Sequence, residues 1–189
     1  MYQHIGQFFE TEFPLNRDGV KELFAGFRLE RYPKGTVLLE AGRKETELRF
    51  LNSGMVREYF AADAEEMNIY FYTRPDFLSD WSSLVNELPT RRYQQALSTV
   101  EVLVQEREQL VKLLERYSCG RDFMYGIFRR KLEQKEAEEF LRKTQSPEAH
   151  YQYLMEQRPD WLLSLPQYHI ASYLNIKPET LSRIRKRIS

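Results

Sequence analysis

Residues 165–189 read LPQYHIASYLNIKPETLSRIRKRIS, a pattern typical of two short helices joined by a tight turn. The first helix would bury an apolar face with helical spacing, formed by Ile170, Ala171 and Leu174. Asn175 tolerates the left-handed backbone conformation in which many helices end, and Ile176 would fill the corner between the two helices. This stretch therefore predicts a helix-turn-helix.

The second of these helices would start near Pro178, since proline is well tolerated in the first turn of a helix. Its buried face would consist of Leu181, Ile184 and Ile188. Its outer face would consist of Glu179, Thr180, Arg183, Lys186 and Arg187. Residues 177–189 contain five basic residues and one acidic residue, a local net charge of +4. The whole chain is neutral, with 28 basic and 28 acidic residues, so attraction to a polyanion has to come from such a local cluster.

This charge distribution favours binding to DNA. In a helix-turn-helix the second helix enters the major groove, and its first turns face the base edges. The residues expected to contact bases are Glu179, Thr180 and Arg183. The residues expected to contact phosphates are Gln167, Tyr168, Lys177, Lys186 and Arg187. The alternative is a helical hairpin whose basic tail is only solvated, but the spacing of the apolar face and the turn favours DNA.

Helical patterns also precede this stretch. They cover residues 106–116 and 121–144, and the Ser-Pro-Glu of residues 146–148 predicts the start of another helix. The apolar stripe of the long helix consists of Met124, Ile127, Phe128, Leu132 and Leu141. Lys131, Lys135 and Glu138 interrupt this stripe, so it is not a regular heptad.

In the first half of the chain, apolar and polar residues alternate as they do in short strands. After helical patterns at residues 3–12 and 16–27, β-prone runs occur at residues 36–39, 48–51, 55–60, 67–72 and 93–105. The Asn-Ser-Gly of residues 52–54 suits a hairpin turn, because asparagine and glycine tolerate positive φ. Short strands separated by turn residues predict an antiparallel sandwich or barrel.

Other function classes lack the residues that they need. Cys119 is the only cysteine, so an internal disulfide is excluded and a reducing compartment fits. His4, His150 and His169 are scattered and have no metal-ligand neighbours at helical spacing. Neither a secretory signal nor an apolar run of about 20 residues is present, which favours the cytoplasm and no membrane contact. We expect no enzyme activity, no metal site and no cofactor.

Two motifs resemble the Crp/Fnr (catabolite activator protein) family of bacterial transcription regulators. The segment at 170–188 is similar to the helix-turn-helix of that family, and YPKGTVLLEAG at 32–42 with NSGMVREYF at 52–60 is similar to its cyclic nucleotide-binding β-roll. The resemblance covers nearly the whole chain. It implies an α+β fold with an antiparallel β-roll sensor of jelly-roll type (residues 1–115), a long dimerisation helix (116–144) and a helix-turn-helix domain (145–189). Pro178 stands where many members have arginine, and the sequence ends where the family has a β-hairpin wing, so most of the wing is expected to be missing.

The same resemblance locates a sensor site. The phosphate cassette of the family has Gly-Glu before a short helix and Arg followed by a small residue after it. Here the matching residues are Ser79, Asp80, Arg91 and Arg92, and bulky Trp81 follows Asp80. Several changes together predict that cyclic-nucleotide binding is lost. The arginine pair would then meet another anion, or lie on a solvated strand edge, or pair with Asp80 or Glu87.

Aromatic residues of the predicted roll leave a further choice open. Tyr70, Tyr72, Trp81 and Tyr93 could line an apolar pocket, but aromatic residues in such a roll more often form plain core.

The resemblance implies double-stranded DNA, a second copy of the chain and RNA polymerase as partners, with a small effector of unknown identity. Two other functions stay open: a ligand-binding or protein-interaction module that has lost DNA binding, and a regulator that still responds to a cyclic nucleotide.

Overall fold

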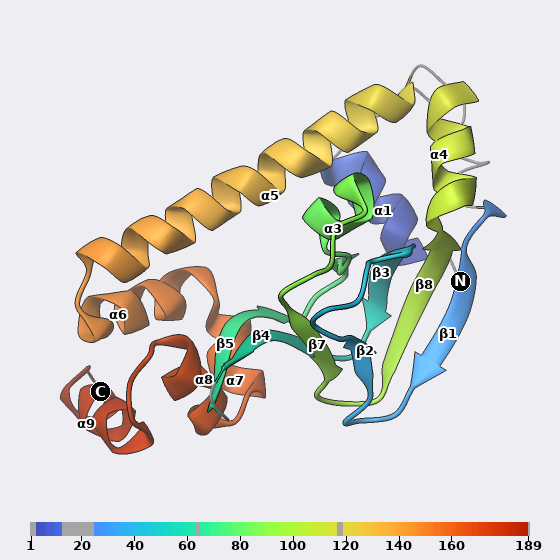
Figure 1. Ribbon diagram of the computed structural model, residues 1–189. Coiled ribbons are helices and arrows are strands. Elements are labelled where there is room, and N and C mark those ends of the chain that lie inside the picture. The colour runs from blue at the N-terminus through green and yellow to red at the C-terminus, as the bar shows by residue number, and fades with distance from the viewer. Residues whose placement is uncertain (1–2, 13–24, 63–64, 117–118, 189) are drawn as a thin grey trace.

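A computed structural model describes residues 3–12, 25–62, 65–116 and 119–188. Two β-sheets pack face to face, a long helix crosses above them, and a group of short helices lies at the far end of that helix (Figure 1). The predicted helix at residues 3–12 is confirmed as α1 (Gln3–Glu12). The predicted helix at residues 16–27 lies mostly outside the described residues.

Each sheet has four strands, and all the pairings are antiparallel. The first sheet has the order β1 (Arg28–Tyr32), β8 (Val100–Glu106), β3 (Glu47–Ser53) and β6 (Asp76–Phe77). The second has the order β2 (Val37–Leu39), β7 (Tyr93–Ala96), β4 (Val56–Ala62) and β5 (Glu65–Tyr72). The expected antiparallel roll is confirmed, and β1 is a strand that the sequence did not predict.

The chain changes sheets at two corners, which corrects the hairpin predicted at residues 52–54. Strands β3 and β4 belong to different sheets and do not pair with each other. Gly54, between them, has a φ of 94°, and a Cβ atom there would lie 2.4 Å from the carbonyl oxygen of Thr99. The close approach of two backbones, rather than a hairpin, requires this glycine. The predicted strand at residues 93–105 is likewise split by the second corner into β7 and β8.

The interior of the roll has the alternation that the sequence predicts. Val100, Val102 and Val104 of β8 point between the sheets, whereas Leu103 faces the opposite side. On that side, the core under the helices consists of Ile5, Phe27, Leu48, Phe50, Phe77, Trp81, Leu84, Leu103, Leu110 and Ile127. Its helices, besides α1, are α3 (Trp81–Asn86), α4 (Arg107–Arg116) and α5 (Cys119–Thr144). Strand β8 is therefore buried on both faces.

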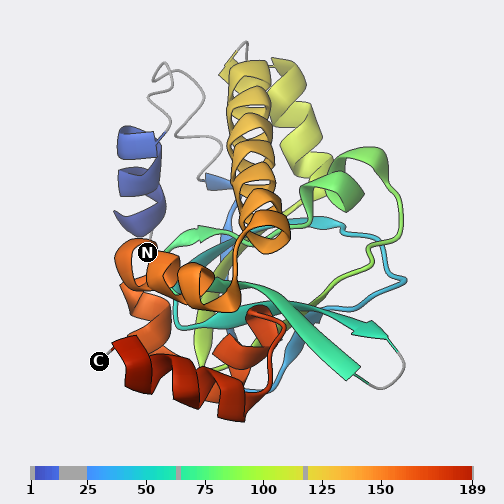
Figure 2. The same cartoon turned by 90° about the vertical axis from the view of Figure 1, so that its left-hand side faces the viewer.

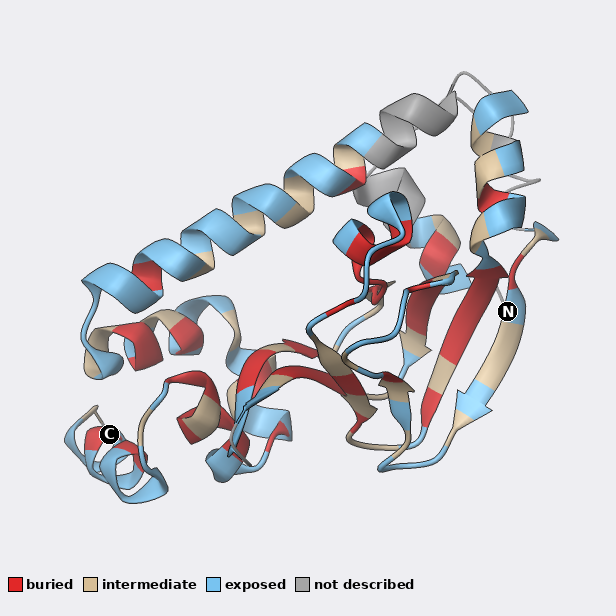
Figure 3. Cartoon of the chain, viewed as in Figure 1, coloured by how far each residue is buried: buried red, intermediate tan, exposed pale blue. Residues whose placement is uncertain are grey.

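The apolar stripe of α5 is divided between two faces. Ile127 and Leu141 are buried against the rest of the chain. Four other residues are 46–70% exposed, namely Tyr125, Phe128, Leu132 and Phe140. The side chain of Met124 lies outside the described set. Figure 3 shows the outer side of α5 as an almost continuous exposed surface.

Four helices follow α5, which are α6 (Pro147–Gln157), α7 (Pro159–Ser164), α8 (Gln167–Tyr173) and α9 (Pro178–Ile188). The predicted start at residues 146–148 is confirmed, because the Ser146 hydroxyl accepts a hydrogen bond from the Ala149 amide at 3.2 Å. These helices do not form a separate core. Phe71 of β5 belongs to their apolar cluster and packs on Trp161 with ring centroids 5.1 Å apart.

We expect the change Phe71→Ala to destabilise the protein by about 3–5 kcal/mol, because it leaves a cavity in the core shared by the sheet and the C-terminal helices. Phe71 is 1% exposed, whereas Leu163 on α7 is 87% exposed and provides a matched control, Leu163→Ala, with almost no effect. Urea unfolding followed by circular dichroism measures both. Equal stabilities of the two variants would contradict a shared core.

Candidate nucleic-acid interface and sensor site

Helices α8 and α9 are joined by the tight turn that the sequence predicts. Asn175 has a φ of 54°, in the left-handed region. The Ile176 amide donates to the Ala171 carbonyl at 3.0 Å, and the Thr180 amide donates to the Lys177 carbonyl at 3.0 Å as α9 begins. These backbone bonds fix the angle between the two helices, and α9 lies on the outer side of α8 (Figure 2).

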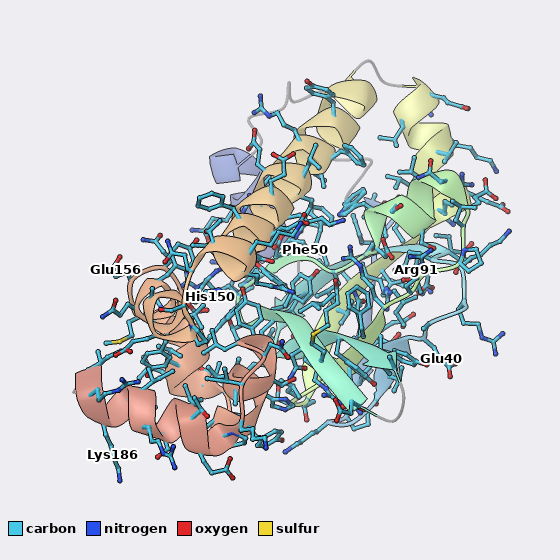
Figure 4. All side chains as sticks on the ribbon, turned by 60° about the vertical axis from the view of Figure 1, so that its left-hand side comes forward. Glu40, Phe50, Arg91, His150, Glu156 and Lys186 are labelled. Carbon is cyan, nitrogen blue, oxygen red and sulfur yellow. The ribbon has the colours of Figure 1, made fainter. Side chains whose placement is uncertain are left out.

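The two faces of α9 differ as the sequence predicts. Leu181 and Ile184 are 1% and 2% exposed and pack in the C-terminal core. The five polar residues of the predicted outer face, Glu179, Thr180, Arg183, Lys186 and Arg187, are all exposed. Figure 4 shows the Lys186 side chain pointing away from the molecule. The helix thus presents a polar, mainly cationic surface to solvent.

The remaining residues predicted to contact phosphates lie beside this surface. Lys177, Gln167 and Tyr168 are exposed, the last to 60%. Arg187 is the one member of the predicted phosphate set with an ion pair among the described residues, since its Nη2 atom lies 3.3 Å from Glu148 Oε2. Because that pair is exposed, a stronger anion can replace Glu148 at little cost.

Helix α8 is held on the outer face of β5 by a polar contact that sequence reasoning missed. The Asn68 amide donates to Ser172 Oγ at 3.0 Å, and that hydroxyl donates to the Glu66 carbonyl at 3.1 Å. The side-chain amide of Asn68 lies 3.2 Å from His169 Nδ1 and donates to it. The partners lie more than 100 residues apart in the chain, so no local pattern could have revealed the contact.

His169 is therefore structural. It is 4% exposed, so its ring does not lie at the surface where a DNA phosphate would bind. Burial, with a contribution from nearby Arg57, lowers the pKa of His169 to about 4. The imidazole is neutral near pH 7 and accepts from Asn68, as the short contact requires.

Two residues of the predicted phosphate cassette, Ser79 and Asp80, form hydrogen bonds within the chain. Asp80 caps α3 by accepting from the amides of Ser82 at 3.1 Å and Ser83 at 3.4 Å, and it accepts from Thr90 Oγ1 at 2.6 Å. Ser79 Oγ accepts from the Arg49 amide at 2.7 Å and donates to the Glu47 carbonyl at 3.0 Å. Neither side chain is free to bind a sugar or a phosphate.

The arginine pair of the cassette is separated by the fold. Arg92 turns inward, where its Nη1 atom lies 2.5 Å from Oε1 of Glu58, a carboxylate that is 2% exposed. Gln94 Nε2 also donates to Glu58, at 3.0 Å, and Tyr72 Oη donates at 3.2 Å. Arg91 is exposed at the far side of the roll (Figure 4). Arg92 is therefore already paired with a buried carboxylate of the chain.

The four aromatic residues proposed for an apolar pocket do not gather in one place. Trp81 packs on Phe77 in the core beneath the helices, and Tyr93 stacks on Tyr59 with centroids 5.1 Å apart. Tyr70 and Tyr72 are together, with centroids 4.8 Å apart. Tyr72 and Trp81 are buried in the core, whereas Tyr70 and Tyr93 are partly exposed, so the set is neither one pocket nor all core.

The described residues contain neither a metal-ligand cluster nor a helix that could span a membrane. No cluster of three or more His, Cys, Asp or Glu residues within them could hold a metal ion. Within the same part of the chain, every helix is too short or too polar to cross a bilayer.

We expect the free energy of unfolding to fall as the pH drops from 6.5 towards 4, because the unfolded chain binds a proton on His169 at its ordinary pKa of 6.5 and the folded chain does so only near 4. The loss is about 1.4 kcal/mol for each pH unit in this window. Urea unfolding at several pH values measures it. The variant His169→Gln keeps an acceptor for Asn68 and should show a weaker pH dependence. An unchanged slope would mean that His169 titrates normally in the folded protein.

Comparisons with known proteins agree with this geometry. Residues 29–117 match the family model of the cyclic nucleotide-binding domain. The structure of FixK2 from Bradyrhizobium japonicum is similar, with a TM-score of 0.74 and 17% identity over 86% of this chain and 84% of that chain. The Thermus thermophilus catabolite activator protein has a TM-score of 0.60 and 20% identity, covering 95% and 85%. CLP from Xanthomonas campestris, a c-di-GMP responsive global regulator, has a TM-score of 0.69 and 16% identity, covering 92% and 91%.

The sequence matches no protein with a curated description. The family model and the shared fold nevertheless agree with the motifs at residues 32–60 and 170–188. Residues 29–117 are therefore similar to a cyclic nucleotide-binding domain, and the chain shares its fold with these solved structures, which confirms the fold that the resemblance implies.

Proposed function

We propose that the protein is a DNA-binding transcription regulator of the Crp/Fnr type, in which α8 and α9 act as a helix-turn-helix. The observation that carries this proposal is the exposed polar face of α9, with Glu179, Thr180 and Arg183 in its first two turns. The buried side of the same helix is fixed by Leu181 and Ile184, so the polar side chains are presented on a rigid element.

The chemistry of this face suits a duplex groove. Arg183 would donate two hydrogen bonds to guanine, Glu179 would accept from cytosine, and Thr180 would contact bases or phosphates. Lys177, Lys186 and Arg187, with Gln167 and Tyr168 at the start of α8, would contact the backbone and set the position of the helix. Two proteins that share the fold are described as an activator protein and as a global regulator, and this supports the proposal.

We further propose that two copies pair through α5. Tyr125, Phe128, Leu132 and Phe140 are exposed on one side of α5, as helical spacing places them together. A monomer leaves these side chains in water, and a twofold pairing of the helices would bury them. Such a dimer would present two copies of α9 to half-sites about one DNA turn apart.

The β-roll would act as the sensor, with a degenerate cassette. Glu58 satisfies Arg92, and Asp80 is used as a helix cap, so we propose that a cyclic nucleotide does not bind there. We propose the functional division that the sequence predicts, with a sensor in residues 1–115, a dimerisation helix in 116–144 and a DNA-binding domain in 145–189. Action in the cytoplasm, with RNA polymerase as a further partner, would follow from this role.

We expect the protein to shift a duplex containing its own upstream region in a mobility-shift assay, and Arg183→Ala to weaken this binding by about 10- to 100-fold, since a lost arginine–guanine pair costs about 1–3 kcal/mol. The variant Lys186→Ala should weaken binding to all sequences alike and make it less sensitive to salt. Arg43→Ala removes an exposed arginine far from α9 and serves as the control. If the wild-type protein binds no DNA at low salt, the module that has lost DNA binding becomes the better description.

We expect Phe128→Glu to convert a dimer into a monomer, because a charge at the centre of the paired helices would be buried without a partner. Size-exclusion chromatography with light scattering gives the mass of each species. Leu163→Glu makes the same kind of change at an exposed apolar residue outside α5 and should leave the dimer intact. A wild-type protein that is monomeric at all concentrations would rule out the pairing through α5.

A further inference from the structure

A cleft of about 340 Å³ lies where the roll, the long helix and the C-terminal helices meet. Its lining includes Tyr70, Thr73 and Arg74 from the end of β5 and the turn that follows it. Arg130 and Gln134 of α5 and Arg158, between α6 and α7, complete it. The cassette residues Ser79, Asp80, Arg91 and Arg92 do not line it. The cleft is therefore separate from the phosphate cassette, and its size lies at the lower end of the range for small-molecule sites.

Arg158 is the central cation of this cleft. Its Nη2 atom donates to Tyr70 Oη at 2.7 Å, and its guanidinium lies over the rings of Tyr70 and Trp161, 5.2 and 4.9 Å from their centroids. Among the described residues, no carboxylate oxygen comes within ion-pair distance of it. Burial alone would lower the pKa of Arg158, but Tyr70, Glu138 and Asp160 raise it, so the group stays charged.

The other charges around the cleft leave it positive. Arg74 Nη2 lies 2.5 Å from Asp160, and Lys131 Nζ lies 3.0 Å from Asp76. Those pairs cancel locally. The half-buried Arg158 contacts a neutral hydroxyl and two rings, and among the described residues the carboxylates of Glu138 and Asp160 act on it only from beyond ion-pair distance. A half-buried cation without a direct ion pair is stabilised by a bound anion, and a planar guanidinium suits a carboxylate or phosphate with two oxygens.

We propose that this cleft binds a small organic anion, with its carboxylate or phosphate on Arg158 and its body over Tyr70, Thr73 and Gln134. Inorganic phosphate alone would leave most of the volume unfilled, and a neutral compound would leave Arg158 without a direct ion-pair partner. The anion class and the location are independent of DNA binding. That the anion is the effector of the regulator rests on the proposed function.

The position of Arg158 gives such a ligand a route to the C-terminal helices. Its backbone amide donates to the Leu154 carbonyl at the end of α6, and its carbonyl accepts from the Trp161 amide at the start of α7. Trp161 in turn packs on Phe71 and on Tyr173 of α8. An anion that moves Arg158 therefore acts on the packing that orients α8 and α9.

Calorimetric titration of the full chain, without DNA, tests the binding site. The probes are AMP, phenyl phosphate and benzoate as organic anions, inorganic phosphate as an anion without a body, and adenosine as a neutral compound. We expect saturable binding of at least one organic anion, weaker binding of inorganic phosphate and no binding of adenosine. Arg158→Gln should weaken that binding by about tenfold or more, and Arg158→Lys should weaken it less because the charge remains.

Arg91→Gln makes the same change at the exposed cassette arginine and should leave the affinity unchanged. If Arg91→Gln loses the anion and Arg158→Gln does not, the ligand binds in the cassette and the proposal is overturned. It is also overturned if none of the organic anions binds or if Arg158→Gln binds as the wild type does. If circular dichroism shows that Arg158→Gln does not fold, Arg74→Gln is titrated with the same anions instead. Arg74 lines the cleft, and its side chain is 61% exposed, so this variant should fold and bind the anion more weakly. Unchanged binding by Arg74→Gln would then overturn the proposal. Failure here leaves the mobility-shift result unaffected, and the reverse also holds.

Discussion

The packing of Phe71 against Trp161 is the contact on which the rest of the arrangement depends. Phe71 belongs to a strand of the roll, yet its side chain is a member of the C-terminal core together with Tyr173, Leu181 and Ile184. Because α8 rests on β5 through this core, the orientation of α9 is set by the sheet and not only by the chain that connects them. A change in the sheet near Phe71 would therefore change the orientation of α9, the helix proposed to contact DNA.

Polar contacts make this packing specific. Apolar side chains alone would permit α8 to slide along β5, since burial depends little on direction. Asn68, His169 and Ser172 form bonds that need one position, and each would leave buried polar atoms unsatisfied if the helix moved. A neutral His169 is part of this arrangement, which links the position of α8 to its protonation state.

Two carboxylates of the roll are held by neighbouring side chains and amides of the chain. Glu58 lies against Arg92, Gln94 and Tyr72, and Asp80 is used by α3 and Thr90. Through these contacts a carboxylate of the chain pairs with Arg92. The cleft at Arg158 has the opposite character, because its cation is surrounded by rings and a hydroxyl. Among the described residues, the two places differ in whether a carboxylate lies at ion-pair distance from the cation.

The sequence by itself determined the classes of element and the two faces of α9, because helix and strand periodicity and the turn at Asn175 are local properties. Leu181 and Ile184 inside, with Arg183 and Glu179 outside, follow from a spacing of three to four residues. It could not determine that residues 52–54 are a corner between sheets, that Glu58 meets Arg92, or that Asn68 meets His169. Those contacts join residues far apart in the chain, and only the packing of the sheets and helices brings them together.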